Sequence, residues 1–314
     1  MDLYKISIKP RTSFCSPLQS DTFFGAFCWS YLYRYGEDAL QELIDHYKKG
    51  DPDIVFSNAF PSGRLPMPLG ITQLKGKQDK TLSRQERYHA YINNKKKEHL
   101  LNISLDDFNR VINGIIEITS DNEDTEFKAL LWRNMVNRES DTAGNIEGEG
   151  SLFETEEIYS EQAYDVYIYS TLEKDVLDPT LREMFRYGIG AQRSVGKGSF
   201  DISGGLEIFD GFHVPEKPNG FVALSNFIPQ KGDPTKGYYK TFVKYPKVSY
   251  ISSDDDSPFK KPLIFLEAGS VFFDQPIRAY YGSCMEKVAL KGGSVSDQIV
   301  IGAYTVAVPC YVEC

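Results

Sequence analysis

The apolar and polar positions in the first two thirds of the chain follow two periodicities, one typical of strands and one of helices. Six segments show them clearly; in chain order they are a strand at 3–9, helices at 23–33 and 38–49, a strand at 164–170, a helix at 181–187 and a strand at 200–203. With one more strand, this order is that of the split βαβ, or ferredoxin-like, core. RRM-type sheets share this layout and often bind RNA, so the pattern predicts an α+β fold of that kind, although a fold by itself does not define a function.

Capping residues and glycines predict where the helices begin and end. Ser20 or Asp21 is the expected N-cap of the first helix, and Gly36 separates that helix from the second. The segment Asp178-Pro179-Thr180 predicts the start of the third helix, and Gly188 predicts its end. The third helix therefore leads directly into a glycine-rich segment.

Two polar stretches interrupt this pattern. Residues 75–110 begin with a strongly charged segment and are predicted to form an exposed helical insertion. The lysines at 95–97 are more typical of a solvated face than of a nucleic-acid patch. Residues 137–160 are poor in apolar side chains and rich in Gly, Glu, Ser and Asn, which predicts a long loop.

From about residue 220 the character of the sequence changes, and strand patterns dominate. The predicted strands of this part are 220–229, 239–250, 263–266, 270–273 and 299–308. Gly211, Pro215 and Pro218 mark a boundary before it. We therefore expect an N-terminal domain, 1–215, that carries the insertion, and a mainly β C-terminal domain, 216–314.

Composition and charge narrow the class of protein. The chain has 314 residues, 41% of them hydrophobic, with neither an apolar run of about 18 residues nor a signal-peptide pattern at its start, so we expect no membrane span and no secretion. Five scattered cysteines without a CxxC pair predict reduced thiols in the cytoplasm and disfavour zinc, and no cofactor is expected. The net charge of −9 argues against bulk nucleic-acid binding. Basic residues nevertheless gather locally, and screening limits the reach of the acidic remainder to about 8–10 Å.

Residues 187–199 form the most unusual segment, with four glycines, Arg193 and Lys197 in one short loop. Glycine admits positive φ angles, and the N–H groups of such a turn can line a concave anion site. The segment is not a P-loop, because Ala191 and Gly198 stand where that motif needs Gly and Ser or Thr, and because it runs from a helix to a strand. We expect a loop that holds phosphate; the alternative is a plain glycine connection with incidental charges.

This loop and several motifs around it resemble those of the RAMP proteins of CRISPR systems. The loop looks like the C-terminal glycine-rich loop of that superfamily, although Ala191 stands where many members carry another glycine. Other motifs are similar to the fourth Csm subunit, a member of the Cas-five group in type III-A effector complexes. These motifs are Ser20–Gly25 with Trp29, Arg133–Arg138 followed by Ser151–Phe153, Leu224–Pro229, Lys260–Pro262 and Glu267–Phe272. They span nearly the whole chain in the expected order.

The resemblance implies two ferredoxin-like, RRM-like RAMP domains and a non-catalytic role, in which the chain holds the 5′ tag of the crRNA and caps one end of the complex. It also implies two protein partners, the large Cas-ten subunit and the backbone RAMP subunit. No membrane, metal or small-molecule substrate is expected. Loop N–H groups and basic side chains would meet RNA phosphates. The expected RNA-binding residues are Ser20, Arg133, Arg138, Gly188, Gly190, Arg193, Ser194, Gly196, Lys197, Gly198, Lys260 and Lys261.

Three alternatives stay open. Arg133 and Arg138 could pair with acidic residues of the 147–157 stretch instead of with phosphate. Some RAMP relatives cleave repeat RNA, a reaction that needs a general acid and base, most often His. The histidines available for it are His46, His89, His99 and His213, and no partner spacing supports any of them as catalytic. The chain could also be a pure protein-interaction subunit, which salt-dependent RNA affinity would distinguish from an RNA-binding one.

Overall fold

The computed structural model describes residues 1–70, 100–115, 118–120, 126–134, 136–137, 142–143, 152–247, 260–288 and 299–312. Most of the expected helical insertion, at 75–99, lies outside the described residues, and so does Arg138. None of the helices in the described ranges combines the length and the hydropathy that a membrane span requires.

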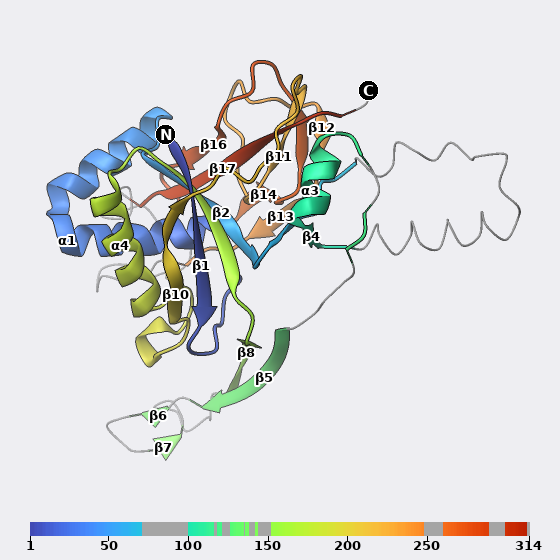
Figure 1. Cartoon of the computed structure of the whole chain (residues 1–314). Helices are drawn as coiled ribbons and strands as arrows, with labels where there is room; N and C mark the ends of the chain where they lie inside the picture. The colour runs from blue at the N-terminus through green and yellow to red at the C-terminus, as the bar shows by residue number, and fades with distance from the viewer. Residues whose placement is uncertain are drawn as a thin grey trace, which may run out of the picture.

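The N-terminal part is built on a four-stranded antiparallel sheet with the spatial order β10-β1-β9-β2 (Figure 1). Its strands are β1 (Asp2–Pro10), β2 (Ile54–Pro61), β9 (Tyr164–Ser170) and β10 (Phe200–Ile208). Helix α1 (Ser20–Lys49) connects β1 to β2, and helix α4 (Lys174–Tyr187) connects β9 to β10. This connectivity and strand order are those of the split βαβ unit, so the predicted α+β character is confirmed. The one further strand that the predicted core needs is β2. The sequence did not reveal it, because its buried start, residues 54–56, is a continuous apolar run without alternation.

The helix boundaries differ in part from the predicted ones. Gly36 breaks α1 as expected, with φ 86° and ψ 178°. The N-cap is Gln19 rather than Ser20 or Asp21, and the first turn is capped from outside, because the N–H of Ser20 donates to Oδ1 of Asn58 at 3.1 Å.

Helix α4 likewise begins earlier than the sequence predicts, so that Pro179 lies inside it. The carbonyl of Glu173 accepts the N–H groups of Val176 and Leu177, both at 2.9 Å, and this bonding completes a turn before the proline. The helix ends at Gly188, as predicted.

The C-terminal part forms a five-stranded antiparallel sheet with the order β12-β15-β11-β17-β16 and a two-stranded sheet of β13 and β14. The bounds are β11 (Gly220–Ala223), β12 (Gly237–Tyr238), β13 (Thr241–Lys244), β14 (Leu263–Leu266), β15 (Val271–Phe273), β16 (Tyr280–Met285) and β17 (Ile301–Cys310). No helix occurs among the residues described beyond 215, in line with the predicted β-rich character. The expected domain boundary falls between β10 and β11, and the division into two domains stays a prediction.

The two sheets share one core. Buried apolar residues of the first sheet and its helices, such as Ile6 and Phe23, belong to the same cluster as Val222 and Val306 of the second sheet. Strand β17 packs against both α1 and β2. The hydroxyl of Tyr304 in β17 donates to the carbonyl of Tyr47 in α1 at 2.7 Å. The sheets are therefore held together by packing and by hydrogen bonds.

Between β2 and β9 the described chain forms two small additions to the core. Strands β3 (Arg64–Pro66) and β4 (Asn102–Ser104) pair, and helix α3 (Leu105–Ile112) follows them. The hydroxyl of Ser104 caps α3 by accepting the N–H of Asp107 at 3.2 Å. Phe108 and Val111 of α3 are fully buried, so this end of the predicted insertion packs on the core instead of standing in solvent.

The second addition is a two-stranded ribbon of β5 (Glu126–Asn134) and β8 (Leu152–Ser160), which projects from the body (Figure 1). The short strands β6 (Val136–Asn137) and β7 (Thr142–Ala143) pair with each other between them. The prediction of one long loop at 137–160 is therefore wrong for 152–160. An exposed ribbon needs no continuous apolar face, because its backbone hydrogen bonds are satisfied between its two strands, and composition alone does not reveal it.

Candidate nucleic-acid interface

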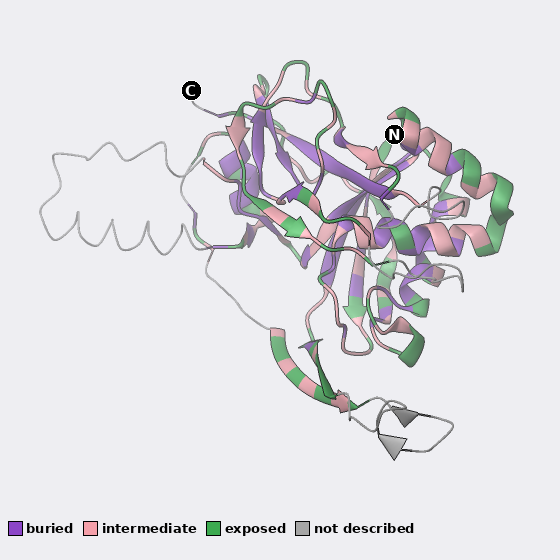
Figure 2. Cartoon of the chain, turned by 180° about the vertical axis from the view of Figure 1, so that it is seen from behind, coloured by how far each residue is buried: buried purple, intermediate pink, exposed green. Residues whose placement is uncertain are grey.

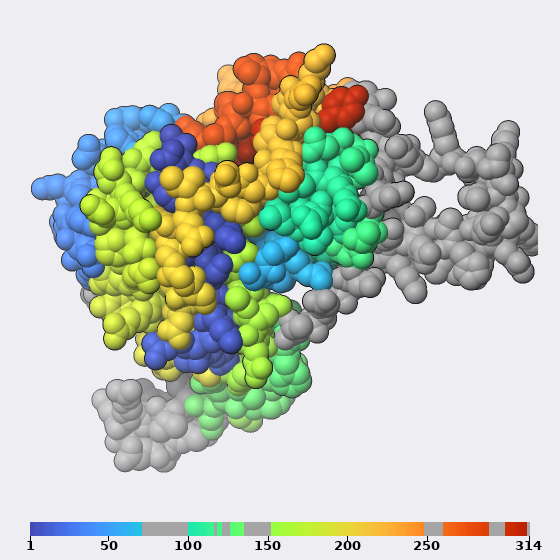
Figure 3. Space-filling model, viewed as in Figure 1, coloured from blue at the N-terminus to red at the C-terminus, as the bar shows by residue number. Residues whose placement is uncertain are grey.

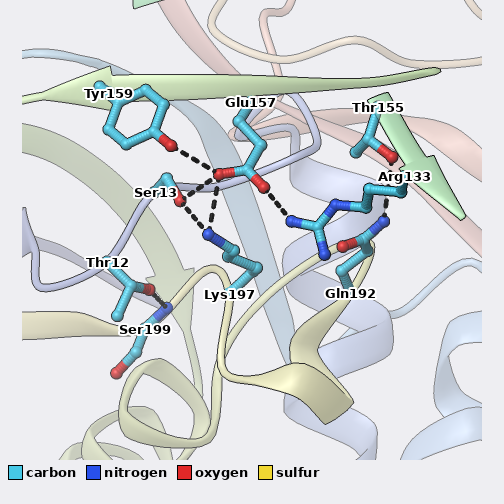
Figure 4. A network of polar contacts seen from close by, with 9 residues as sticks. All are labelled: Thr12, Ser13, Arg133, Thr155, Glu157, Tyr159, Gln192, Lys197 and Ser199. Carbon is cyan, nitrogen blue, oxygen red and sulfur yellow. Dashed lines mark hydrogen bonds and ion pairs between the residues drawn. The ribbon is translucent and has the colours of Figure 1, made fainter. Parts of the chain in front are cut away.

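A fully buried carboxylate, that of Glu157 in β8, lies where the ribbon meets the glycine-rich loop (Figure 4). Its Oε2 accepts hydrogen bonds from Nζ of Lys197 at 2.8 Å, from the hydroxyl of Ser13 at 2.8 Å and from the hydroxyl of Tyr159 at 2.9 Å. Its Oε1 accepts a hydrogen bond from Nη2 of Arg133, which completes an ion pair. Burial by itself would raise the pKa of this carboxyl, but the four donors outweigh burial and lower the pKa to about 2.

The partners of Glu157 from outside β8 come from three segments of the fold. Ser13 lies between β1 and α1, Arg133 lies in β5, and Lys197 lies in the glycine-rich loop. Ribbon pairing places Arg133 and Glu157 on the same face, since both are odd-numbered positions of strands in which Ala129 lies opposite Glu157. Two cations thus share one carboxylate, which leaves one positive charge at the junction.

A further contact ties the loop to the ribbon. Nε2 of Gln192 donates to the hydroxyl of Thr155 at 3.3 Å, on the same ribbon face as Glu157. Gln192 adopts a left-handed backbone conformation with φ 61°. The loop and the ribbon base are therefore joined at Gln192 and at Lys197, and they form one surface.

Two of the four loop glycines serve to close the loop. Gly188 and Gly198 are buried, and the carbonyl of Gly198 accepts the N–H of Ile189 at 2.8 Å. A Cβ on Gly198 would lie 2.1 Å from the carbonyl oxygen of Ile189. The N–H of Gly198 donates to the carbonyl of Ser13, and that of Gly196 donates to the carbonyl of Arg193. These two N–H groups, expected to face phosphate, already have acceptors in the chain.

The exposed rim of the loop is the turn at 193–196. A short 3₁₀ helix covers Arg193–Val195, and Ser194, Val195 and Gly196 are exposed. Arg193 is half-exposed, and within the described part of the chain its side chain pairs with no carboxylate. Gly190 lies behind the rim against Ser16, whose hydroxyl accepts the N–H of Ala191 at 2.9 Å. Among the predicted phosphate contacts in the loop, Ser194 and Gly196 are thus exposed, and Arg193 beside them carries a charge that no described carboxylate neutralises.

The other expected RNA contacts gather near the start of α1. Ser20 is buried, and its hydroxyl donates to the carbonyl of Asn226 at 3.2 Å, which disfavours a direct contact with RNA. Lys260 is half-buried, and its burial lowers the pKa of its ammonium group. The nearby carboxylate of Asp21 acts against this lowering, whereas the positive charge of Lys244 adds to it. Nζ of Lys244 lies 2.7 Å from Oδ1 of Asp21. Lys261 is exposed, and its Nζ donates to the carbonyl of Lys287 at 3.0 Å. The predicted residues in the described part therefore fall into two groups, one at the glycine-rich loop and the ribbon and one near the start of α1. Segment 11–19, between β1 and α1, connects the two groups.

Two of the four histidines, His46 and His213, lie in the described part of the chain. Nδ1 of His46 lies 2.8 Å from Oδ2 of Asp53, in the last turn of α1. His213 hydrogen-bonds α3 through its backbone, while His89 and His99 lie outside the described residues. No group of three or more potential metal ligands is found among the residues that the structure describes.

Some residues of the site could not have been found from the sequence. Arg133 pairs with Glu157, so the alternative in which this arginine binds the acidic stretch 147–157 is what the structure shows. Ser13 and Gln192 carry no sequence signal, because their importance follows from contacts between segments distant in the chain.

A split βαβ sheet, a glycine-rich loop between a helix and a strand, and a projecting ribbon make this a mixed α/β protein, and this fold agrees with the expected RAMP-like one. No protein-family profile and no curated protein sequence matches the chain. Solved structures do match over nearly the full length. A Csm1-Csm4 cassette in complex with cA4 gives a TM-score of 0.60 at 18% identity, covering 99% of both chains. A Csm1-Csm4 cassette with pppApA gives 0.59 at 19%, covering 99% of this chain and 98% of that chain. A Csm3-Csm4 subcomplex of the type III-A CRISPR-Cas interference complex gives 0.59 at 16%, covering 98% and 99%.

The matching chains are Csm4 chains, so the predicted resemblance to the fourth Csm subunit is confirmed in the fold. At these identities the likeness defines the fold and not the activity.

Proposed function

We propose that this chain is a non-catalytic subunit of a type III-A CRISPR interference complex. It holds the 5′ tag of the crRNA and bridges the large Cas-ten subunit to the backbone RAMP subunits. Support comes from the full-length likeness to Csm4 chains, which are found in complexes with Csm1 and with Csm3. On this proposal the chain divides into 1–215 and 216–314, and the second unit is a β-rich variant of the ferredoxin-like fold whose described residues supply the sheet but no helix.

The observation that carries RNA binding is the exposed rim of the glycine-rich loop beside the Glu157 cluster. Arg193 offers a guanidinium that no carboxylate of the described residues neutralises, and Ser194 offers a hydroxyl next to it. The contact between the ribbon and the loop keeps one net positive charge, because the two cations Arg133 and Lys197 share the single carboxylate of Glu157. A phosphate at the rim would therefore meet a local positive field, although the whole chain carries −9.

Removal of the Arg193 charge tests the proposal. Because the side chain makes no hydrogen bond, ion pair or ring contact with the described residues, Arg193→Ala is expected to change stability by less than about 0.5 kcal/mol and to weaken binding of a tagged crRNA about 3- to 10-fold. The slope of log affinity against log salt should become shallower by about 0.7, the value for one phosphate contact on a single strand. Binding is measured by fluorescence anisotropy, for the chain alone and together with its large subunit.

Lys49→Ala is the matched control, since it removes one exposed positive charge at the end of α1 and should leave both affinity and salt slope at the wild-type values. RNA binding that is indifferent to Arg193 in both settings would make the loop architectural and favour the protein-interaction alternative. Cleavage of a repeat RNA that disappears in His46→Ala would favour the endoribonuclease.

A further inference from the structure

A segment of the C-terminal part, residues 234–247, is rich in lysine and tyrosine and carries no acidic residue. Its lysines recur at intervals of three or four positions, at 236, 240, 244 and 247, with tyrosines between them. Aromatic residues among closely spaced cations are typical of surfaces that bind single-stranded nucleic acid. The expected RNA contacts in this part of the chain are only Lys260 and Lys261, so this segment adds a candidate surface.

The structure places Tyr245 on the outer face of the small sheet of β13 and β14. Val243 lies directly opposite Ile264, and Tyr245, two positions further along the chain, continues this face. The N–H of Lys260 donates to the carbonyl of Pro246 at 2.8 Å, so the two segments stay side by side beyond the ends of the strands. The backbone around Tyr245 is therefore held in place.

The two faces of this sheet differ in exposure. On the inner face, the rings of Phe242 and Phe265 stack with their centroids 5.8 Å apart. On the outer face, Val243, Tyr245 and Ile264 are 51%, 69% and 65% exposed (Figure 2). Within the described part of the chain, no hydrogen bond or ring contact holds the Tyr245 side chain. Strands β10 and β1 cover the opposite side of the molecule, which Figure 3 shows.

The charges near Tyr245 favour an anionic ligand. Lys240, Lys247 and Lys261 are exposed, and within the described ranges neither Lys240 nor Lys261 pairs with a carboxylate. Glu267, directly after β14, is half-buried and donates its N–H to the carbonyl of Lys240 at 3.0 Å. Among these described side chains, three lysines stand against one carboxylate, so a phosphate would meet a positive field. Lysine is depleted in the cores of protein interfaces, which disfavours a protein partner here.

This surface is connected to the glycine-rich loop by segment 16–19. The hydroxyl of Ser16 accepts the N–H of Ala191 in the loop at 2.9 Å. Nζ of Lys244 in β13 donates to Oε1 of Gln19 at 2.6 Å. Three residues of extended chain span at most about 11 Å, so the loop and β13 lie within reach of one RNA strand of a few nucleotides.

We propose that Tyr245 and the lysines around it form a second contact surface for single-stranded RNA. We call this surface the tyrosine strip; its members are Tyr245, Lys240, Lys247 and Lys261. A base stacks on the ring of Tyr245, and the lysines neutralise the neighbouring phosphates. That the strand is the crRNA held at the glycine-rich loop rests on the proposed function. An acidic protein surface is the other class of ligand for such a face, and the experiments below distinguish it from RNA.

The direct test is photo-cross-linking read by peptide mass spectrometry. Tagged crRNA that carries 4-thiouridine at a single position, a different one in each sample, is bound to the wild-type chain together with the purified large subunit and is then irradiated. We expect a cross-link to Tyr245 from at least one of these positions, because a stacked base and the ring are in van der Waals contact. Binding of all these RNAs without any cross-link within residues 240–247 would overturn the proposal.

Variants measure the affinity of the same contact. Tyr245→Ala should weaken binding of tagged crRNA about tenfold, the loss typical of one stacked base. Tyr245→Phe keeps the ring and should bind within about twofold of the wild type. Lys240→Ala should make the slope of log affinity against log salt shallower by about 0.7. Tyr33→Ala, which removes an exposed aromatic side chain of similar accessibility on α1, is the matched control and should bind as the wild type does.

The outcomes separate this inference from the proposed function. If Arg193→Ala weakens RNA binding while Tyr245→Ala and Lys240→Ala bind as the wild type does, the tyrosine strip is not an RNA contact and the proposed function stands. If the wild-type chain binds tagged crRNA neither alone nor with the large subunit, both fail together. If Tyr245→Ala keeps its RNA affinity but loses the large subunit, the surface binds protein and the inference is wrong.

Discussion

Glu157→Gln is expected to lower the free energy of unfolding by about 3 kcal/mol at pH 7, the loss that follows when one partner of a buried ion pair is removed. The substitution leaves Arg133 and Lys197 facing each other without a negative charge, and it replaces an acceptor of four hydrogen bonds by a weaker one. Removing one partner of a buried ion pair is strongly destabilising because the other charges stay partly desolvated. Urea unfolding followed by circular dichroism at pH 7 measures the change.

The same substitution carries a pH signature with a defined sign. The folded-state pKa of Glu157 is depressed to about 2, so its contribution is fully present above the ordinary glutamate pKa and is lost as pH falls toward 2. The difference in stability between wild type and Glu157→Gln should therefore shrink from about pH 4.5 downward. Glu156→Gln, at the exposed neighbouring position, should change stability by less than about 0.5 kcal/mol at pH 7. A difference that persists undiminished near pH 2 would contradict the assigned role of the carboxylate.

Gly198→Ala is expected to destabilise the chain by about 3 kcal/mol, because two effects add. The residue has φ 70°, which non-glycine residues adopt only at a penalty, and the new Cβ would lie 2.1 Å from the backbone oxygen of Ile189. A backbone atom cannot rotate away as a side chain does, so the loop must open. Urea unfolding gives the loss of stability, and RNA affinity should fall with it because the rim at 193–196 loses its support.

Gly196→Ala separates conformation from crowding. Gly196 has φ 86°, but nothing lies within 4 Å of a Cβ at this position. The substitution should therefore destabilise by about 1 kcal/mol through backbone conformation alone. Equal effects at both positions would show that Gly198 is not closely packed against Ile189.

Much of the fold could be predicted because local patterns agree with it. Strand β9 coincides with the predicted 164–170, and α4 ends at the predicted Gly188. Elements that depend on distant partners were missed. The start of β2 is buried on both sides, so it lacks alternation, and β8 is held by pairing with β5 rather than by an apolar face of its own.

The location of the candidate site could be predicted from the sequence, but its hydrogen bonds and ion pairs could not. The crowding of glycines and cations identifies the loop, and the nearby carboxylates raise the possibility that Arg133 is paired. Which carboxylate is buried, and that Lys197 shares it, depends on a ribbon whose strands the composition conceals. Sequence spacing cannot rank Arg193 above Lys197 as an RNA contact, whereas their contacts in the fold do.

The packing of β17 on α1 and β2 has a consequence for synthesis of the chain. Gly302 lies against the ring of Phe24, and Tyr304 hydrogen-bonds the backbone of Tyr47, so the last described strand covers residues that are synthesised more than 250 positions before it. While the ribosome is still translating, the apolar side of α1 has no partner from β17. The nascent N-terminal half must therefore wait, exposed or shielded by a chaperone, until residues 301–310 leave the exit tunnel.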